Sequence, residues 1–291
     1  MNDVGDGTDT TTPKLNPTEA FSSHPPMLLV AGMHRSGTSA ISGVCERLGC
    51  KVLGEQVPAA ADNPKGFFEN RRIVDFHDRL LKSIGSSHDD PLLIGPDELN
   101  ALLDNGAGNE LAAILFEEFG ATPMTLVKDP RMARFLPIWA RALELSGRQI
   151  LVLLPLRHPI EVAGSLQKRN GYSQAHGLLL WLSHTLAAER DSRGLARSFT
   201  LYDALLDDWR STLQKVSQDL KIRWPRSIGR TGDQIDEFLE RGMRHHKADG
   251  MTAASSDALR ALCSRAWAAM ETLVQDAGDT LSLASLDAVR D

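Results

Sequence analysis

The stretch Gly32-Met-His-Arg-Ser-Gly-Thr-Ser39 decides the fold of this chain. It follows the apolar run Met27–Ala31, which predicts a buried strand, and it leads into a segment from Thr38 to Leu48 whose apolar residues recur at helical spacing. Its two glycines have the spacing of the phosphate-binding pattern G-x-x-x-x-G-K-[ST], in which glycine lets the backbone turn sharply and approach an anion. Thr38 stands in place of the lysine, so Arg35 is the nearest cation in the loop. The stretch therefore predicts an anion-binding turn between a strand and a helix, suited to a phosphate donor other than an ordinary nucleoside triphosphate.

The second half of the chain repeats the order of strand and helix. This alternation predicts an α/β protein with a P-loop-containing three-layer α/β/α fold around a central parallel sheet. The expected strands are 27–31, a short one at 51–53, 124–127, 149–156 and 198–201, and the expected helices are 38–48, 69–84, 132–146, 159–168, 174–191, 203–220, 233–243 and 255–276.

Composition along the chain predicts its domains. Residues 1–25 are rich in Asp, Thr and Pro and indicate a flexible tail, whereas residues 26–291 are expected to form a single domain whose part from about 225 onward is helical. Residues 86–109 are rich in Asp, Gly, Pro and Ser, which favours a surface excursion with little regular structure and makes it a candidate lid.

Overall composition excludes several classes of function. With 291 residues, 42% of them hydrophobic and 24% charged, the chain is typical of a soluble globular protein. A net charge of -6 argues against nucleic acid as a partner, since such binding needs a broad basic face. No apolar run reaches the length of a transmembrane segment and no signal peptide is visible. Three cysteines without a metal-ligand spacing suit a reducing compartment, so a cytoplasmic location is expected, while the oligomeric state stays open.

Three predicted loops at strand ends carry cations. They are the opening loop with Arg35, the segment Lys128-Asp-Pro-Arg131 and the segment Arg157-His-Pro159. Because the carboxyl ends of parallel strands meet at one edge of a sheet, where ligands bind, these cations are expected to surround a polyanion.

Three features of the chain together resemble the sulfotransferase family that uses 3′-phosphoadenosine-5′-phosphosulfate. They are the loop Arg35–Ser39, the segment beginning Lys128-Asp-Pro, and the pair of Arg157 and Ser165. The two members of that pair are eight positions apart across a predicted helix that Pro159 opens. The arginine-containing loop is most similar to tyrosylprotein and carbohydrate sulfotransferases, and Asp62–Asn70 resembles a segment of short bacterial members. The likeness runs in islands from about 27 to about 209. It implies transfer of a sulfuryl group to a hydroxyl of a carbohydrate, glycoconjugate or other small acceptor, with no metal.

The resemblance also implies roles for individual residues. Arg157 and Ser165 would hold the 3′-phosphate of the donor, and Tyr202 would contact its adenine. The 5′-phosphosulfate would lie against Arg35, Ser36, Gly37, Thr38 and Ser39. By its position, Lys128 is expected to neutralise charge on the bridging oxygen as the sulfuryl group departs.

The chain departs from the family pattern at two places. Ala40 stands where a tryptophan often follows the loop, and the carboxy-terminal loop of glycine and lysine is not recognisable. Arg226 and the Arg244-His-His246 cluster are candidate substitutes for that loop.

The acceptor hydroxyl requires a general base. Glu69, which opens a predicted helix after a turn, and Glu55 are the two candidates, and Glu55 is followed by Gln56 where tyrosylprotein sulfotransferases carry a second glutamate. His34, His77 and His88 are weaker candidates.

Two other functions fit parts of the pattern. A P-loop kinase of a small metabolite would use Mg²⁺ and an aspartate such as Asp129, although the missing lysine counts against it. A nucleotide-binding module without catalytic activity would keep the anion site and lack the base.

Overall fold

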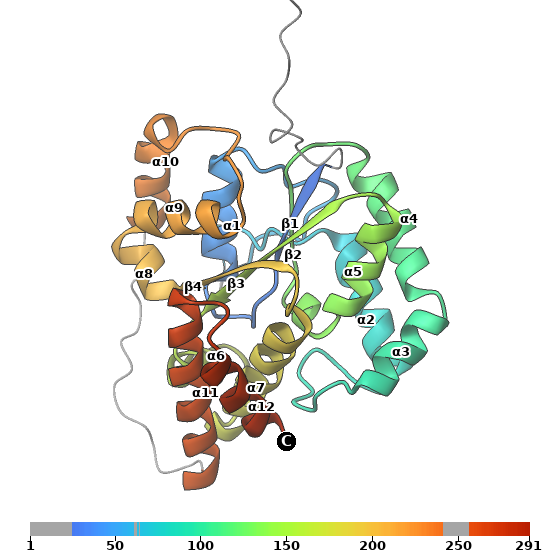
Figure 1. The fold of residues 1–291 in the computed structure, drawn as a ribbon, viewed down its shortest axis with the longest axis vertical. Coiled ribbons are helices and arrows are strands. Elements are labelled where there is room, and N and C mark those ends of the chain that lie inside the picture. Colours follow the sequence, from blue (N-terminus) through green and yellow to red (C-terminus); the bar gives the residue numbers. More distant parts are fainter. Residues whose placement is uncertain (1–24, 61–62, 64, 241–255) are drawn as a thin grey trace, which may run out of the picture.

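The computed structural model describes residues 25–60, 63, 65–240 and 256–291. They form an α/β fold around a four-stranded, all-parallel sheet with the strand order β2-β1-β3-β4 (Figure 1). The strands are β1 (Pro26–Val30), β2 (Thr125–Lys128), β3 (Gln149–Leu156) and β4 (Ala196–Leu201). The four longer strands predicted from apolar runs are therefore confirmed, within one or two residues at their ends.

Helices cover both faces of this sheet (Figure 1). One face carries α1 (Thr38–Arg47), α8 (Tyr202–Asp207), α9 (Trp209–Asp219) and α10 (Ile228–Glu240). The other packs against α2 (Arg71–Ser83), α3 (Pro96–Asp104), α4 (Ala107–Phe119), η2 (a 3-10 helix, Pro130–Arg134), α5 (Leu136–Leu145), α6 (Pro159–Asn170), α7 (Gln174–Asp191), α11 (Asp257–Gln275) and α12 (Thr280–Arg290).

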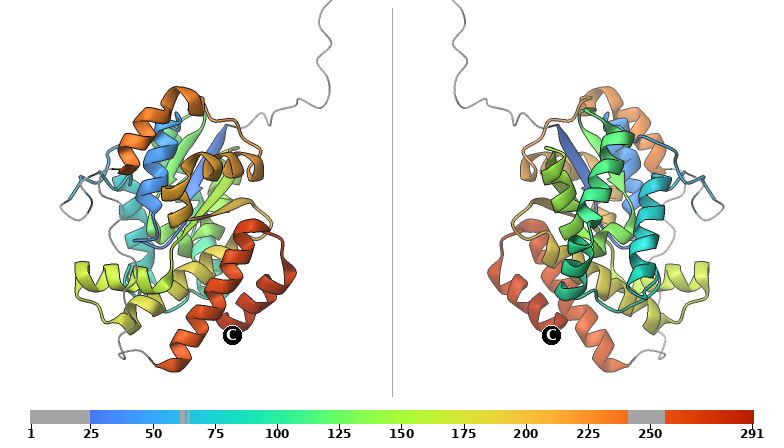
Figure 2. Two further views of the ribbon diagram at one scale, coloured as in Figure 1. Left: turned by 90° about the vertical axis from the view of Figure 1, so that its left-hand side faces the viewer. Right: turned by 90° about the vertical axis from the view of Figure 1, so that its right-hand side faces the viewer.

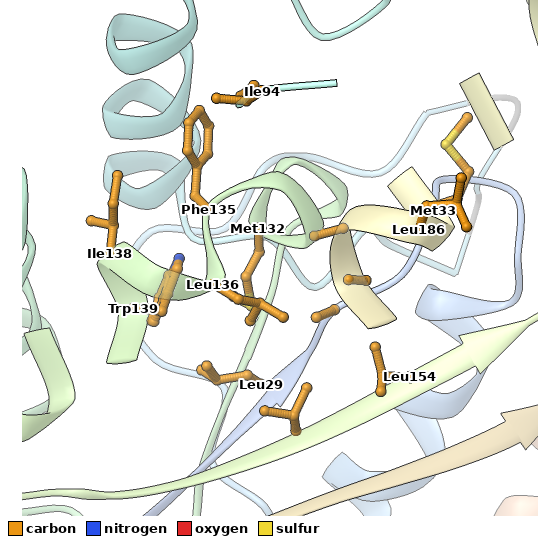
Figure 3. Close-up of a cluster of buried hydrophobic side chains, with 14 of the residues drawn as sticks. Leu29, Met33, Ile94, Met132, Phe135, Leu136, Ile138, Trp139, Leu154 and Leu186 are labelled. Carbon is orange, nitrogen blue, oxygen red and sulfur yellow. The ribbon is translucent and has the colours of Figure 1, made fainter. Parts of the chain in front are cut away.

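Alternating side chains of β1 supply two separate cores. Leu28 and Val30 are buried under α1 and α9, whereas Met27 and Leu29 are buried on the opposite face. Figure 3 shows Leu29 on that second face, close to the side chains of the α5 segment. Both faces of the strand are covered, so it is apolar throughout rather than alternating with polar residues.

The strand order brings four chain segments to one edge of the sheet. Because β1 lies between β2 and β3, the chain leaves β1 first to one side and later to the other, which makes the carboxyl end of β1 a topological switch point. The loop 31–37 begins there, and β2, β3 and β4 end nearby at Lys128, Leu156 and Leu201.

The last two helices, α11 and α12, were predicted only in part from the sequence. α11 packs against α7 and β4, and α12 packs back on α11 (Figure 2). A single helix was predicted at 255–276, and the second one, α12, was not. Within the described residues, no helix is both long enough and apolar enough to cross a membrane.

The prediction of little regular structure across 86–109 is confirmed for 86–95 and wrong for 96–104 and from 107 onward, where α3 and α4 lie. Residues 96–104 form α3, with Pro96 in the first turn and the Glu98 carboxylate accepting a hydrogen bond from the N–H of Gly95. Leu99 and Leu102 are buried and tie α3 to the core. Proline and acidic residues, which indicate a loop in sequence, here open a helix because the first helical turn tolerates both.

Two smaller predictions also change. Lys51 makes only an isolated bridge with Thr125, so 51–53 is not a strand. The helix predicted at 203–220 breaks at Asp208, whose carboxylate caps α9 by accepting from the N–H of Ser211. Of the predicted tail at 1–25, residues 1–24 lie outside the part of the chain that the structure describes.

Candidate active site

A cavity of about 170 Å³ lies at the carboxyl edge of the sheet, where the loop after β1 meets the end of β2. Its walls come from parts of the chain that are far apart in sequence. They are His34, Arg35, Thr38 and Ser39; Asn63, Phe67 and Glu69; His88; Lys128, Pro130 and Arg131; and Arg169, Asn170 and His184.

The loop after β1 turns tightly before α1. Arg35 has a φ of 68°, which is uncommon and strained for a residue other than glycine, and Gly37 has a φ of 87°. Gly37 is also the N-cap of α1 and offers no side chain to the amides of the first turn. A helix N-terminus that begins in this way can receive the oxygens of an anion.

Gly37 is required for space as well as for conformation. A Cβ atom added there would lie 2.4 Å from Cδ2 of Tyr202. We expect Gly37→Ala to lower the free energy of unfolding by about 1–2 kcal/mol through the left-handed backbone alone, with a further loss from displacing Tyr202. Urea unfolding would measure it. Gly164→Ala is the matched control, because Gly164 lies inside α6 with nothing within 4 Å of an added Cβ. A loss for Gly164→Ala as large as that for Gly37→Ala would contradict this account.

Arg35 joins the loop to α6. Its Nε donates to Oγ of the buried Ser165 over 2.8 Å, a contact between residues 130 positions apart. Arg157 lies on the other side of the loop, where its Nη1 is 3.4 Å from the carbonyl oxygen of Arg35 and its Nε donates to Glu161 over 2.8 Å. The predicted cations Arg35 and Arg157 thus meet at the loop, but Ser165 contacts Arg35 rather than Arg157.

Tyr202 lies between the loop and Arg157. The Arg157 guanidinium is 4.8 Å from the centre of the Tyr202 ring, and the ring edge approaches Gly37. Burial raises the pKa of Tyr202, so its phenol stays protonated at neutral pH. Tyr202 therefore lies beside the loop and does not line the cavity, and its contact with adenine stays a prediction.

Lys128 and Glu69 form the most buried ion pair of the cavity wall. Lys128 Nζ lies 2.5 Å from Glu69 Oε1 and 3.0 Å from the carbonyl oxygen of Phe67, and it is 3.4 Å from Oγ of Ser39 in the first turn of α1. Lys128 is 2% exposed and Glu69 8%. A buried pair of this kind costs desolvation free energy that a merely structural contact seldom recovers. The pair places an ammonium and a carboxylate side by side in the cavity wall, where the first can offset negative charge and the second can accept a proton.

Local structure explains how the two groups meet. Lys128 is the last residue of β2, so its side chain lies at the carboxyl edge. Glu69 precedes Asn70, the N-cap of α2, whose Oδ1 accepts from the N–H of Ile73 over 3.2 Å. The start of α2 thus fixes the Glu69 backbone against the end of β2.

The structure does not bring Glu55 to the cavity. Its carboxylate pairs with Nε of Arg71 at 3.0 Å, and its side chain is 76% exposed. Of the two carboxylates that the sequence proposed as a base, Glu69 lines the cavity and Glu55 faces solvent.

His77 supports the turn after β2 through a contact with Asp129. Trp139 Nε1 donates to His77 Nε2 over 2.9 Å, and because an indole N–H can only donate, the proton of His77 is on Nδ1 and points to Asp129 at 3.0 Å. Burial raises the pKa of Asp129, but the charge of Arg131 and the contact with His77 outweigh it and leave the pKa below its usual range. His77 is fully buried and does not line the cavity. Its geometry therefore fits support of the turn rather than the role of general base, for which the sequence made it a weaker candidate.

Two histidines, His34 and His184, also line the cavity. His34 and His184 stack with ring centres 6.0 Å apart. Burial lowers the pKa of His184 to about 3, and burial together with nearby positive groups lowers the pKa of His34 well below its usual value. Both rings therefore remain uncharged at neutral pH. Nothing in the sequence singled out His184 or Arg169, since their place in the cavity depends on how α6 and α7 pack.

A larger hollow, of about 530 Å³, lies near the far end of α1 and includes Arg226. The backbone N–H of Arg226 donates to the carbonyl oxygen of Leu48, close to the carboxyl end of α1. This hollow is remote from the strand ends, so we place the site in the smaller cavity. Arg226 does not reach that cavity, and the Arg244–His246 cluster lies outside the described residues.

No protein-family model matches the sequence, and a search of curated proteins finds no match either. In the part of the chain that the structure describes, no group of three or more His, Cys, Asp or Glu side chains is placed to hold a metal ion.

Proposed function

We propose that this protein is a sulfotransferase that moves a sulfuryl group from 3′-phosphoadenosine-5′-phosphosulfate to a hydroxyl of a carbohydrate, glycoconjugate or other small acceptor. The observation that carries the proposal is the buried pair of Lys128 and Glu69 beside Ser39, in the first turn of α1 directly after the loop. One cavity thereby holds a cation for a leaving phosphate and a carboxylate for an attacking hydroxyl. The loop itself is proposed as a P-loop variant in which Arg35 replaces the lysine.

The donor's phosphosulfate would lie against the loop and the first turn of α1. The hydroxyl oxygen of the acceptor attacks sulfur, and the bond between sulfur and the bridging oxygen breaks with its electron pair left on the phosphate. The Lys128 ammonium offsets that developing negative charge, and Glu69 takes the hydroxyl proton. The products are a sulfate ester and adenosine 3′,5′-bisphosphate.

The ion pair also orients these groups before the reaction. Lys128 is held by Glu69 and by the carbonyl oxygen of Phe67, so its ammonium already lies near the loop. A preorganised charge of this kind stabilises a transition state without the cost of reorienting a side chain.

A kinase of small metabolites is the second enzyme considered. Asp129 would have to bind Mg²⁺, but it is fully buried, contacts His77 and Arg131, and does not line the cavity. This geometry favours the sulfotransferase. A non-catalytic nucleotide-binding module would not need a buried carboxylate next to the cation.

A cytoplasmic location belongs to the same proposal. Cys45, Cys50 and Cys263 are free and buried, which is consistent with a reducing compartment.

Arg157 is proposed to hold the 3′-phosphate of the donor. Arg157→Ala should weaken binding of adenosine 3′,5′-bisphosphate by about 10- to 150-fold, the equivalent of one charge-assisted hydrogen bond. Binding of 5′-AMP, which lacks that phosphate, should change much less. Calorimetry of both ligands would measure the difference, with Arg210→Ala on the exposed side of α9 as control. Equal losses for the two nucleotides would remove Arg157 from the 3′-phosphate site.

A screen for the transferred group tests the function itself. Incubation of the protein with donor labelled in its sulfur, together with sugars, phenols and peptides, should place the label in an organic product. Transfer of the terminal phosphate from ATP to one of these acceptors, with no sulfur transfer, would support the kinase instead.

A further inference from the structure

Three separate segments besides the loop after β1 supply polar side chains to the cavity wall. His88 comes from the loop 86–92, Arg131 from the turn after β2, and Arg169 with Asn170 from the end of α6. An acceptor must lie against this wall if the donor occupies the loop. The chemistry of the wall therefore bears on the class of acceptor.

Arg134 fixes the loop 86–92 to the body of the protein. It is only 2% exposed, and its guanidinium donates to the carbonyl oxygens of Ser87 over 2.9 Å and Leu92 over 3.0 Å. Burial lowers the pKa of Arg134. A buried guanidinium bound to backbone carbonyls holds both ends of the loop that presents His88, so this part of the predicted lid is a fixed wall.

A second contact ties the same loop to the end of α6. The hydroxyl of Tyr172 donates to Asp89 over 3.1 Å. Asp89 also accepts from Ser87, and Asp90 accepts from Ser86 and from the N–H of Leu92. The two carboxylates of the loop thus make contacts with Tyr172 or within the loop, and neither lines the cavity.

Positive charge dominates the lining of the described cavity. Arg35, Lys128, Arg131 and Arg169 all line it, whereas Glu69 is the one carboxylate among the described lining residues. Glu69 forms an ion pair with Lys128. Arg131 forms ion pairs with Asp129 and with the half-exposed Asp78. Arg169 and Lys128 both act as positive neighbours of His34.

We propose that the acceptor carries a carboxylate close to the hydroxyl that is sulfated, and that Arg169 and Arg131 bind this carboxylate in the cavity that His34 and His184 also line. The inference rests on the proposed function and adds the class of acceptor to it. A uronic acid is the simplest sugar with both groups, and a neutral sugar would bring no negative charge to this cationic wall. A charge-assisted hydrogen bond from a guanidinium would give the discrimination.

Binding of D-glucuronate and D-glucose to the protein saturated with adenosine 3′,5′-bisphosphate tests this inference. The two sugars differ in one carboxylate, and the side-chain nitrogen resonances of His34 and His184 would report occupancy next to the donor. We expect saturable shifts with glucuronate at concentrations roughly tenfold or more below those needed with glucose, since one charge-assisted bond is worth about that factor. Equal responses to the two sugars, or no saturable response to glucuronate, would overturn the inference.

Arg169→Gln should abolish the preference for glucuronate, and Lys168→Gln should keep it, because Lys168 is exposed at the same helix end and does not line the cavity. A preference that survives in Arg169→Gln would also overturn the inference. Binding of the bisphosphate, measured first in the same samples, distinguishes failure of the inferred acceptor class from failure of the proposed function. Bisphosphate binding without a preference for glucuronate would reject the acceptor class and leave the proposed sulfotransferase intact, whereas absence of bisphosphate binding would reject both.

Discussion

Glu69→Gln should lower turnover of the donor by about 100- to 10,000-fold, because the amide keeps the shape of the side chain and cannot accept the proton of the acceptor hydroxyl. The amide oxygen can still accept a hydrogen bond from Lys128, so the fold should persist. Affinity for adenosine 3′,5′-bisphosphate should change little. Rates of labelled sulfate transfer to an acceptor found in the screen, together with calorimetry of the bisphosphate, would measure both quantities.

Glu55→Gln is the matched control for this experiment. Glu55 was the rival candidate in the sequence, and in the structure its carboxylate is exposed and paired with Arg71. We therefore expect wild-type turnover for Glu55→Gln. Turnover that falls in Glu55→Gln and not in Glu69→Gln would reverse the assignment of the base, and turnover unaffected in either would remove both carboxylates from the reaction.

Lys128→Ala should lower turnover by about 100- to 1,000-fold, which is the usual loss when one preorganised group that stabilises transition-state charge is removed. The loss should exceed the loss in affinity for the bisphosphate, because Lys128 is proposed to act on charge that develops as the sulfur bond breaks. Single-turnover rates and calorimetric dissociation constants would give the comparison. Equal losses in both would show that Lys128 contributes to ground-state binding only.

The variant leaves Glu69 buried without its partner, which costs about 3–5 kcal/mol of stability in comparable pairs. Thermal melting would show whether Lys128→Ala remains folded at the assay temperature. Added ethylammonium should restore part of the turnover if the missing cation is the cause, whereas it would not repair a disordered site. Lys82→Ala, on the exposed part of α2, is the control and should keep wild-type turnover.

Much of the fold follows from local sequence. The apolar strands and the glycine-containing turn at 32–39 are short-range patterns, so the parallel sheet and its carboxyl edge were predictable from them. α4 was not predicted, because its first residues, from Ala107, lie in the segment 86–109 for which little regular structure was expected. α12 lies in a region where the sequence offered one helix and the structure has two.

The candidate site was predictable only in part. Arg35, Lys128 and Arg157 follow from the rule that loops at strand ends meet, and the structure brings them to the same edge. The contact of Arg35 with Ser165 could not be predicted, because sequence spacing does not say which face of α6 turns toward the loop. Arg169 and His184 were not predicted as site residues for the same reason, since long-range packing of α6 and α7 places them.

Calorimetry with adenosine 3′,5′-bisphosphate, in the absence of Mg²⁺ and beside ATP with and without Mg²⁺, tests the central claim most directly. The account predicts saturable binding of the bisphosphate without metal, tighter than that of ATP by roughly tenfold or more, since the 3′-phosphate adds a charge-assisted contact that ATP cannot make. Intact binding of ATP that depends on Mg²⁺, with no binding of the bisphosphate, would contradict it.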